Sequence, residues 1–188
     1  MKNILLNYKF FFLQFIYFVK NPDNQIPNFQ TRNQNLREVC YYFFILDFVI
    51  TLLLRYLTEI MEKLILFTFP MSKNDIKLSM VEMVIIGIII SPLVEETVFR
   101  YPLKFLGKNN FKWKLYLFCT IFALLHLTNY QINSDHILYI PFILKIQIFA
   151  GFILSYIRLK YGFWYGVLLH SMGNACSLIW LNTIGFDI

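Results

Sequence analysis

The chain has 188 residues, of which 58% are hydrophobic and only 15% are charged, whereas about 45–50% of the residues in an average soluble domain are apolar. The excess, which includes 21 Phe and 12 Tyr, lies in long runs and excludes an ordinary soluble domain. The net charge of +6 comes mostly from the flanks of these runs. The lipid bilayer is therefore the expected partner, and nucleic-acid binding is not expected.

Residues 1–37 are predicted to form a separate N-terminal segment. Residues 3–19 have an aromatic-rich helical pattern that is interrupted by three polar residues, which favours an amphipathic helix in the membrane interface over a spanning helix. Residues 21–35 are polar and contain two prolines, a composition typical of a linker.

Residues 38–188 are predicted to form an all-α, polytopic membrane bundle of about five spanning helices. Each candidate has close to the ~20 residues that a helix needs to cross the hydrocarbon. In chain order, the candidates run approximately over residues 39–57, 79–100, 114–129, 137–157 and 162–182.

The positions of the basic residues predict the orientation of this bundle. Twelve of the 17 Lys and Arg residues fall on the side of the linker and four on the opposite side, with Lys145 inside the fourth span. Because cytoplasmic loops carry an excess of Lys and Arg, we expect residues 20–38 in the cytoplasm and the C-terminus outside. The expected location is a bacterial cell membrane.

Three ionisable residues, Glu95, Glu96 and Arg100, follow the nearly unbroken apolar run 81–90. A charge at the centre of a membrane helix costs ~2.5–3.5 kcal/mol on insertion scales, so such residues ordinarily have a function. Glu96 and Arg100 are i,i+4 neighbours that can pair, whereas Glu95 points about 100° away from Glu96. We therefore predict that Glu95 faces the interior of the bundle as a general base.

Two histidines on later helices are expected at a similar depth. Counted at ~1.5 Å per residue from the nearest cytoplasmic lysine, Glu95 lies roughly 13–14 Å, His126 roughly 18 Å and His170 roughly 15 Å along its helix. His126 could then share or orient the proton of an attacking water, with its ring held by Phe122 one turn earlier. His170 and Asn174 share a helix face, from which their N–H groups could stabilise an oxyanion.

Each of these residues alone also has a structural explanation, because His and Asn form hydrogen bonds between membrane helices. Asp47, in the first span, is either a functional residue or a locally paired one.

The chain has no GxSxG and no HExxH motif, which argues against the hydrolases that use them. Its cysteines, which lie in apolar segments without metal-ligand spacing, are expected to be free thiols: Cys40, Cys119 and Cys176.

Taken in order, Glu95–Glu96–x3–Arg100, Phe122–x3–His126 and His170–x3–Asn174 resemble the three motifs of the CPBP intramembrane protease family. That family includes the type II CAAX prenyl endopeptidases and the bacterial Abi proteins. The resemblance covers a core at about residues 78–182 and implies hydrolysis of a peptide bond within the bilayer. The substrate would be a membrane-associated peptide or protein, with a prenylated CAAX-type substrate as one candidate.

By motif position, the resemblance implies that Glu95 and His126 activate water, that His170 and Asn174 stabilise the oxyanion, and that Glu96 and Arg100 support the first motif. No cofactor is expected to be required. The family has also been described as metalloproteases, so zinc on Glu95, His126 and His170 is the alternative; Asn, however, is a poor zinc ligand. Two other functions stay open: a non-catalytic, Abi-like membrane immunity or binding protein on the same scaffold, and a small ion or proton transporter.

Overall fold

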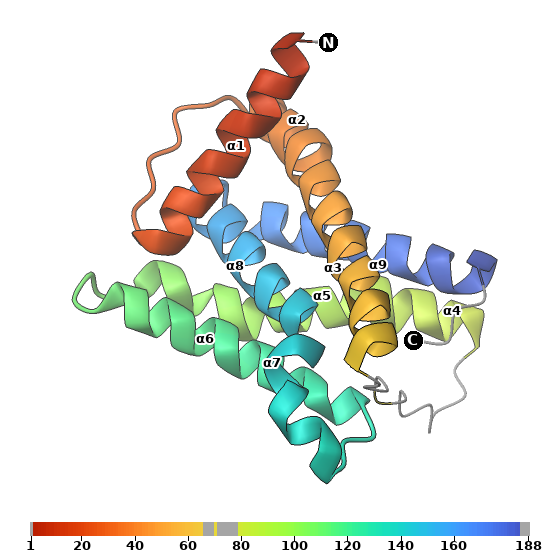
Figure 1. Ribbon diagram of the computed structural model, residues 1–188. Coiled ribbons are helices and arrows are strands. Elements are labelled where there is room, and N and C mark those ends of the chain that lie inside the picture. The colour runs from red at the N-terminus through yellow and green to blue at the C-terminus, as the bar shows by residue number, and fades with distance from the viewer. Residues whose placement is uncertain (1, 66–69, 71–78, 185–188) are drawn as a thin grey trace.

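The computed structural model describes residues 2–65, 70 and 79–184, and every regular element in these ranges is a helix (Figure 1). The predicted all-α fold class is therefore confirmed for the described residues. At the centre lies α8 (Lys145–Lys160), against which α6 (Phe111–Leu125) and α9 (Phe163–Ile184) pack. Because residues 153–159 of α8 are all buried, this helix forms the middle of the protein core.

The N-terminal helix α1 (Lys2–Lys20) packs on the centre of the bundle. Its residues Phe11, Phe15 and Phe18, three to four positions apart and thus on one helix face, are buried. The rings of Phe15 and Phe18 lie 6.1 and 5.2 Å from the ring of Tyr156 in α8. This face of α1 is thus covered by protein, and the place of α1 in the membrane interface stays a prediction.

The first predicted span, 39–57, is the middle of a longer rod. That rod consists of α2 (Arg32–Arg37), the π-helical segment η1 (Glu38–Phe43) and α3 (Phe44–Ile65). It begins at a capping box in which the side chains of Thr31 and Gln34 satisfy each other's backbone N–H groups. The cap extends the helix into the polar sequence that precedes the apolar run.

A buried hydrogen bond ties this rod to the turn between α8 and α9. The Tyr161 hydroxyl donates to Glu38 Oε2 at 2.6 Å. Burial and this hydrogen bond raise the pKa of Tyr161 above its ordinary value. The turn itself depends on Gly162, whose φ of +113° is readily accessible only to glycine.

The second predicted span, 79–100, is built of four consecutive helical segments: α4 (Met80–Met83), η2 (Val84–Ile90), α5 (Ser91–Glu95) and η3 (Glu96–Arg100). Pro92 lies inside this rod, where it has no N–H to donate and its ring crowds the carbonyl one turn earlier. The π-helical segments η2 and η3 lie on either side of this residue. Such wider turns are frequent at functional sites.

The remaining helical segments are short and connect the longer ones: η4 (Pro102–Phe105), η5 (His126–Asn129), η6 (Ser134–Tyr139) and α7 (Ile140–Ile143). Among them, η5 continues α6 as a tighter turn. It therefore sets the direction of His126, its first residue.

Three helical stretches within the described residues are long and apolar enough to cross a membrane: Arg32–Leu64, Phe111–Asn129 and Ser134–Lys160. They match the predicted spans 39–57, 114–129 and 137–157. The count of five is not confirmed: 79–100 and 162–182, which carry the polar candidate residues, are not among these three stretches. These two spans, and the boundary between residues 37 and 38, stay predictions.

Candidate active site

The two adjacent glutamates lie in different environments. Glu96 has a side chain with 0% exposure, and its Oε1 lies 3.5 Å from Arg100 Nη1, the pairing that their spacing predicted. The side chain of Glu95 is 22% exposed and accepts a hydrogen bond from Ser91 Oγ at 2.5 Å. Because Glu95 ends α5 and Glu96 begins the π-helical segment η3, the helix changes its winding between them.

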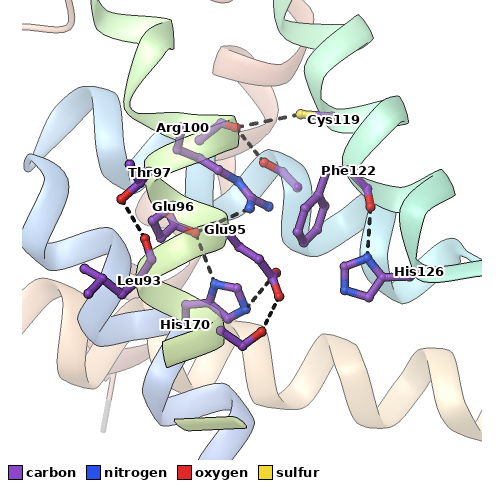
Figure 2. A network of polar contacts seen from close by, with 12 residues as sticks. Leu93, Glu95, Glu96, Thr97, Arg100, Cys119, Phe122, His126 and His170 are labelled. Carbon is purple, nitrogen blue, oxygen red and sulfur yellow. Dashed lines mark hydrogen bonds and ion pairs between the residues drawn. The ribbon is translucent and has the colours of Figure 1, made fainter. Parts of the chain in front are cut away.

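Arg100 is held by an aromatic ring as well as by Glu96. Its guanidinium carbon lies 3.6 Å from the centroid of the Phe122 ring on α6 (Figure 2). A desolvated cation–π contact of this kind is worth about 2 kcal/mol. The same ring contacts His126 edge-on, at a centroid distance of 4.6 Å. The predicted packing of Phe122 against His126 is therefore confirmed, and Phe122 also couples the first motif to the second.

His170 bridges the two glutamates (Figure 2). Its Nδ1 lies 3.1 Å from Glu96 Oε1 and its Nε2 lies 3.6 Å from Glu95 Oε2. An ionised carboxylate only accepts hydrogen bonds, so Nδ1–H donates to Glu96. His170 thus lies between the two carboxylates on the neighbouring helix α9, and its hydrogen bond fixes the position of Glu96.

His126 is oriented by its own helix. Its Nδ1–H donates to the carbonyl oxygen of Phe122 at 2.9 Å, and in the neutral ring this leaves Nε2 as an acceptor. His126 and Glu95 line one cavity of about 170 Å³, together with Phe99 and Phe122. The structure therefore places the predicted base and its predicted partner around one space.

Asn174 lies one turn after His170 on α9, and its side chain faces the second rod. Its Nδ2 donates to the carbonyl oxygen of Gly87 in η2 at 2.7 Å, which leaves its other N–H available. Because both ring nitrogens of His170 face carboxylates, the expected pair of oxyanion donors, His170 with Asn174, is not assembled in this arrangement. The role of both residues in catalysis stays a prediction.

A larger cavity of about 980 Å³ adjoins the small one and shares Phe122 and His126 with it. One face of α3 lines it, and His170 and Asn174 line it from α9. Most of the other lining residues are apolar. The site therefore opens into a space large enough for several residues of a peptide.

The three residues suggested as zinc ligands, Glu95, His126 and His170, do not form a ready metal centre. A metal bound to Nε2 of His170 would displace only the contact with Glu95, because Nδ1–H can keep its hydrogen bond to Glu96. Within the parts of the chain that the structure describes, no group of three or more His, Cys, Asp and Glu side chains is placed to hold a metal ion. Metal independence stays a prediction.

The family model for type II CAAX prenyl endopeptidase Rce1-like proteins matches residues 77–176. This range is more than half of the chain and contains all three motifs and every candidate site residue. The chain belongs to this Rce1-like family. No curated protein and no solved structure matches it. This family consists of CAAX-type intramembrane proteases. Since the chain also has apolar helices long enough to cross a membrane, it is an integral membrane protein.

Two glycines of this Rce1-like protein bring α9 close to the site, and the sequence analysis missed both. A Cβ on Gly166 would lie 2.9 Å from Glu96 Oε2, and a Cβ on Gly173 would lie 3.6 Å from Asp47 Oδ2. The spacing of Gly166, His170 and Gly173 puts them on one face of α9. Small residues at such spacing let membrane helices approach closely. The spacing of Gly166 and Gly173 was therefore the signal in the sequence for a close approach of α9.

Asp47, in α3, lies against the face of α9 that carries Gly173. Its carboxylate is close enough to interact electrostatically with His170, and it lines the larger cavity. The sequence analysis left this residue open between a functional and a structural role. The structure makes it a third carboxylate beside His170.

Replacing Gly166 with alanine is expected to destabilise the Rce1-like protein by about 1–3 kcal/mol, because the new methyl group overpacks a filled site. Glu96 cannot easily move away, since Arg100 and His170 hold its carboxylate. Thermal unfolding in detergent measures the effect. Gly87→Ala is the control, as a Cβ there has no neighbour within 4 Å. Equal unfolding temperatures for the two variants would contradict the close packing.

Proposed function

We propose that this protein is a glutamate-dependent intramembrane endopeptidase that hydrolyses a peptide bond of a membrane-associated substrate. The observation that carries this proposal is the cavity of about 170 Å³ lined by both Glu95 and His126. A water molecule takes up about 30 Å³ in the liquid. The cavity thus has room for an attacking water between a carboxylate and an imidazole that come from different helices.

In the proposed reaction, the water oxygen attacks the carbonyl carbon of the scissile bond while Glu95 takes one of its protons. Nε2 of His126 accepts a hydrogen bond from the same water and directs its lone pair toward the carbonyl carbon. Glu95 then returns the proton to the leaving nitrogen as the C–N bond breaks. The products are a new carboxyl group and a new amine.

The tetrahedral intermediate carries negative charge on the former carbonyl oxygen, which requires hydrogen-bond donors. Asn174 lines the larger cavity and retains one side-chain N–H after bonding to Gly87. We assign this N–H to the oxyanion. His170 instead holds Glu95 and Glu96 in place.

Glu96 and Arg100 support the site without meeting the substrate, since both side chains are almost fully buried. Their opposite charges stabilise each other in a space that water does not reach. Arg100 also contacts the Phe122 ring, which in turn contacts His126. The pair thus couples the position of the base to the position of its partner on α6.

The larger cavity favours a substrate with apolar groups, because its volume of about 980 Å³ is lined mostly by apolar residues. A prenylated CAAX-type peptide has this character and is the proposed substrate class. No cofactor is assigned. The cytoplasmic placement of residues 20–38 belongs to the same proposal.

Reconstitution into vesicles tests this function. The protein is mixed with a prenylated CAAX-type peptide and with the same peptide without its prenyl group, and the products are identified by mass spectrometry. We expect hydrolysis of a single peptide bond, faster for the prenylated peptide. Intact peptides, together with proton flux into vesicles that contain a pH-sensitive dye, would instead indicate a transporter.

Replacing His126 with alanine is expected to lower kcat about 10²-fold, because the attacking water loses one of its two directing groups. The unfolding temperature should change little, since His126 is only partly buried. His136→Gln is the control: His136 lines neither cavity, and glutamine can replace it in the capping box of η6. If both variants cleaved the peptide at the wild-type rate, the role of His126 would be wrong.

A further inference from the structure

Two arginines are buried among the described residues: Arg100, which pairs with Glu96, and Arg158, which takes no part in the proposed reaction. Arg158 is 8% exposed and lies in the last turn of α8. Taking a guanidinium out of water costs free energy unless a partner compensates its charge. The groups that Arg158 contacts therefore indicate what it does.

Arg158 holds the C-terminal end of η3. Its Nη2 donates to the carbonyl oxygen of Tyr101 at 3.5 Å, and its guanidinium carbon lies 5.2 Å from the centroid of the Tyr101 ring and 5.8 Å from that of Phe163. Tyr101 directly follows η3, and its own N–H donates to the carbonyl oxygen of Glu96 at 2.7 Å. The carbonyl groups at the end of a helix carry partial negative charge, which a cation stabilises. Arg158 is thus connected to the backbone of Glu96 through a single residue.

Arg158 also acts on the side chain of Glu96. The two groups interact electrostatically, and both approach Gly166 on α9: a Cβ there would lie 2.9 Å from Glu96 Oε2 and 4.0 Å from Arg158 Cβ. Among the described residues, neither Glu96 Oε2 nor Arg158 Nε has a hydrogen-bond partner. The two neighbouring side chains thus present a buried acceptor and a buried donor of opposite charge.

The negative charges beside His170 outnumber the single cation that is paired with them, Arg100. Three carboxylates lie beside this ring: those of Asp47, Glu95 and Glu96. Carboxylates that lie close together resist joint ionisation, and Glu96 accepts the hydrogen bond from His170 Nδ1–H most strongly as an anion. A second cation beside Glu96 favours this arrangement, and Arg158 supplies it.

We infer that Arg158 is a positioning residue of the active site, which adds a second positive charge beside Glu96 and holds the end of η3. The assignment rests on the proposed endopeptidase function. Arg158 lines neither of the two cavities, so it does not meet the substrate. Its effect reaches the reaction through Glu96 and His170, since His170 contacts Glu96 with one ring nitrogen and faces the base Glu95 with the other.

Replacing Arg158 with methionine removes the charge and tests this role, with kcat and KM measured for cleavage of a prenylated CAAX-type peptide in vesicles. We expect kcat to fall about 10–100-fold, the range for neighbours in one ion-pair network. KM should stay unchanged, because Arg158 does not touch the substrate. Arg158→Lys keeps the charge but loses the planar group that lies over the two rings, so it should recover kcat in part.

The matched control is Lys160→Met, which removes another cation from the last turn of α8. Lys160 donates to Gln14 on α1 at 3.0 Å and interacts electrostatically with Glu38, and it lines neither cavity. Its variant should cleave the peptide at the wild-type rate. A loss of kcat as large as that of Arg158→Met would overturn the inference, because any cation at this end of α8 would then have the same effect.

Combining Arg158→Met with Glu96→Gln shows whether Arg158 acts through the charge of Glu96. Glutamine has nearly the same shape as glutamate but no negative charge for the guanidinium to offset. Arg158→Met should therefore lower kcat and the unfolding temperature in detergent clearly in the wild-type background, and much less in Glu96→Gln. Equal losses in both backgrounds, or an Arg158→Lys protein no more active than Arg158→Met, would overturn the inference.

The unfolding temperatures allow this inference and the endopeptidase function to fail separately, because they are measured without substrate. A wild-type protein that cleaves no peptide would refute the endopeptidase function. A loss of unfolding temperature that depends on the charge of Glu96 would still support the positioning of Glu96 by Arg158. Cleavage by Arg158→Met at the wild-type rate would instead overturn the inference and leave the endopeptidase function intact.

Discussion

Replacing Glu95 with glutamine is expected to lower kcat about 10²–10⁴-fold, the usual contribution of a general acid–base group. The amide has nearly the same shape and can still accept the hydrogen bond from Ser91, but it cannot take a proton from water. KM should stay within a few-fold of the wild-type value. Peptide cleavage in vesicles measures both constants.

Glu82→Gln is the matched control for this variant. Glu82 lies on the same rod, but it is exposed and serves in the capping box of α4, a position where glutamine functions as well as glutamate. Its cleavage rate should equal that of the wild type. A Glu95→Gln protein that kept its full rate would show that another group activates the water.

Replacing Arg100 with methionine is expected to destabilise the protein by about 3–5 kcal/mol, the cost of breaking a buried ion pair by removal of one partner. The change leaves the Glu96 carboxylate, with 0% exposure, without its guanidinium. The contact with the Phe122 ring is lost as well. Chemical or thermal unfolding in detergent measures the loss, and Arg37→Met, at an exposed position, is the control.

The double variant Glu96→Leu/Arg100→Met distinguishes an ion-pair effect from a packing effect. Replacing both buried charges with apolar groups removes the unpaired carboxylate, so the double variant should recover most of the lost stability. It should not recover activity, because His170 then has only one glutamate to hold. A double variant as unstable as Arg100→Met would mean that the guanidinium acts mainly through packing.

The helices were predictable where hydrophobic runs are long, since apolar runs of that length predict membrane-spanning helices. The predicted ends were less accurate: α3 belongs to a rod that begins at Arg32, because a local capping box extends it into polar sequence. In the same way, η1, η2 and η3 were not predicted. A π-helical turn depends on how the helix packs, and η2 and η3 also lie on either side of Pro92. The hydropathy pattern does not record either feature.

The sequence by itself determined which residues are candidates for the site. Charged and polar side chains are costly within apolar runs, so Glu95, Glu96, Arg100, His126 and His170 were conspicuous, and the i,i+4 spacing alone predicted the pairing of Glu96 with Arg100. Only the tertiary structure decided that His170 lies between the two glutamates while His126 and Glu95 line one cavity. It also brought Asp47 to the face of α9 that carries His170. The reason is physical: the spacing of residues fixes directions within one helix, whereas the rotation of each helix against its neighbours depends on packing.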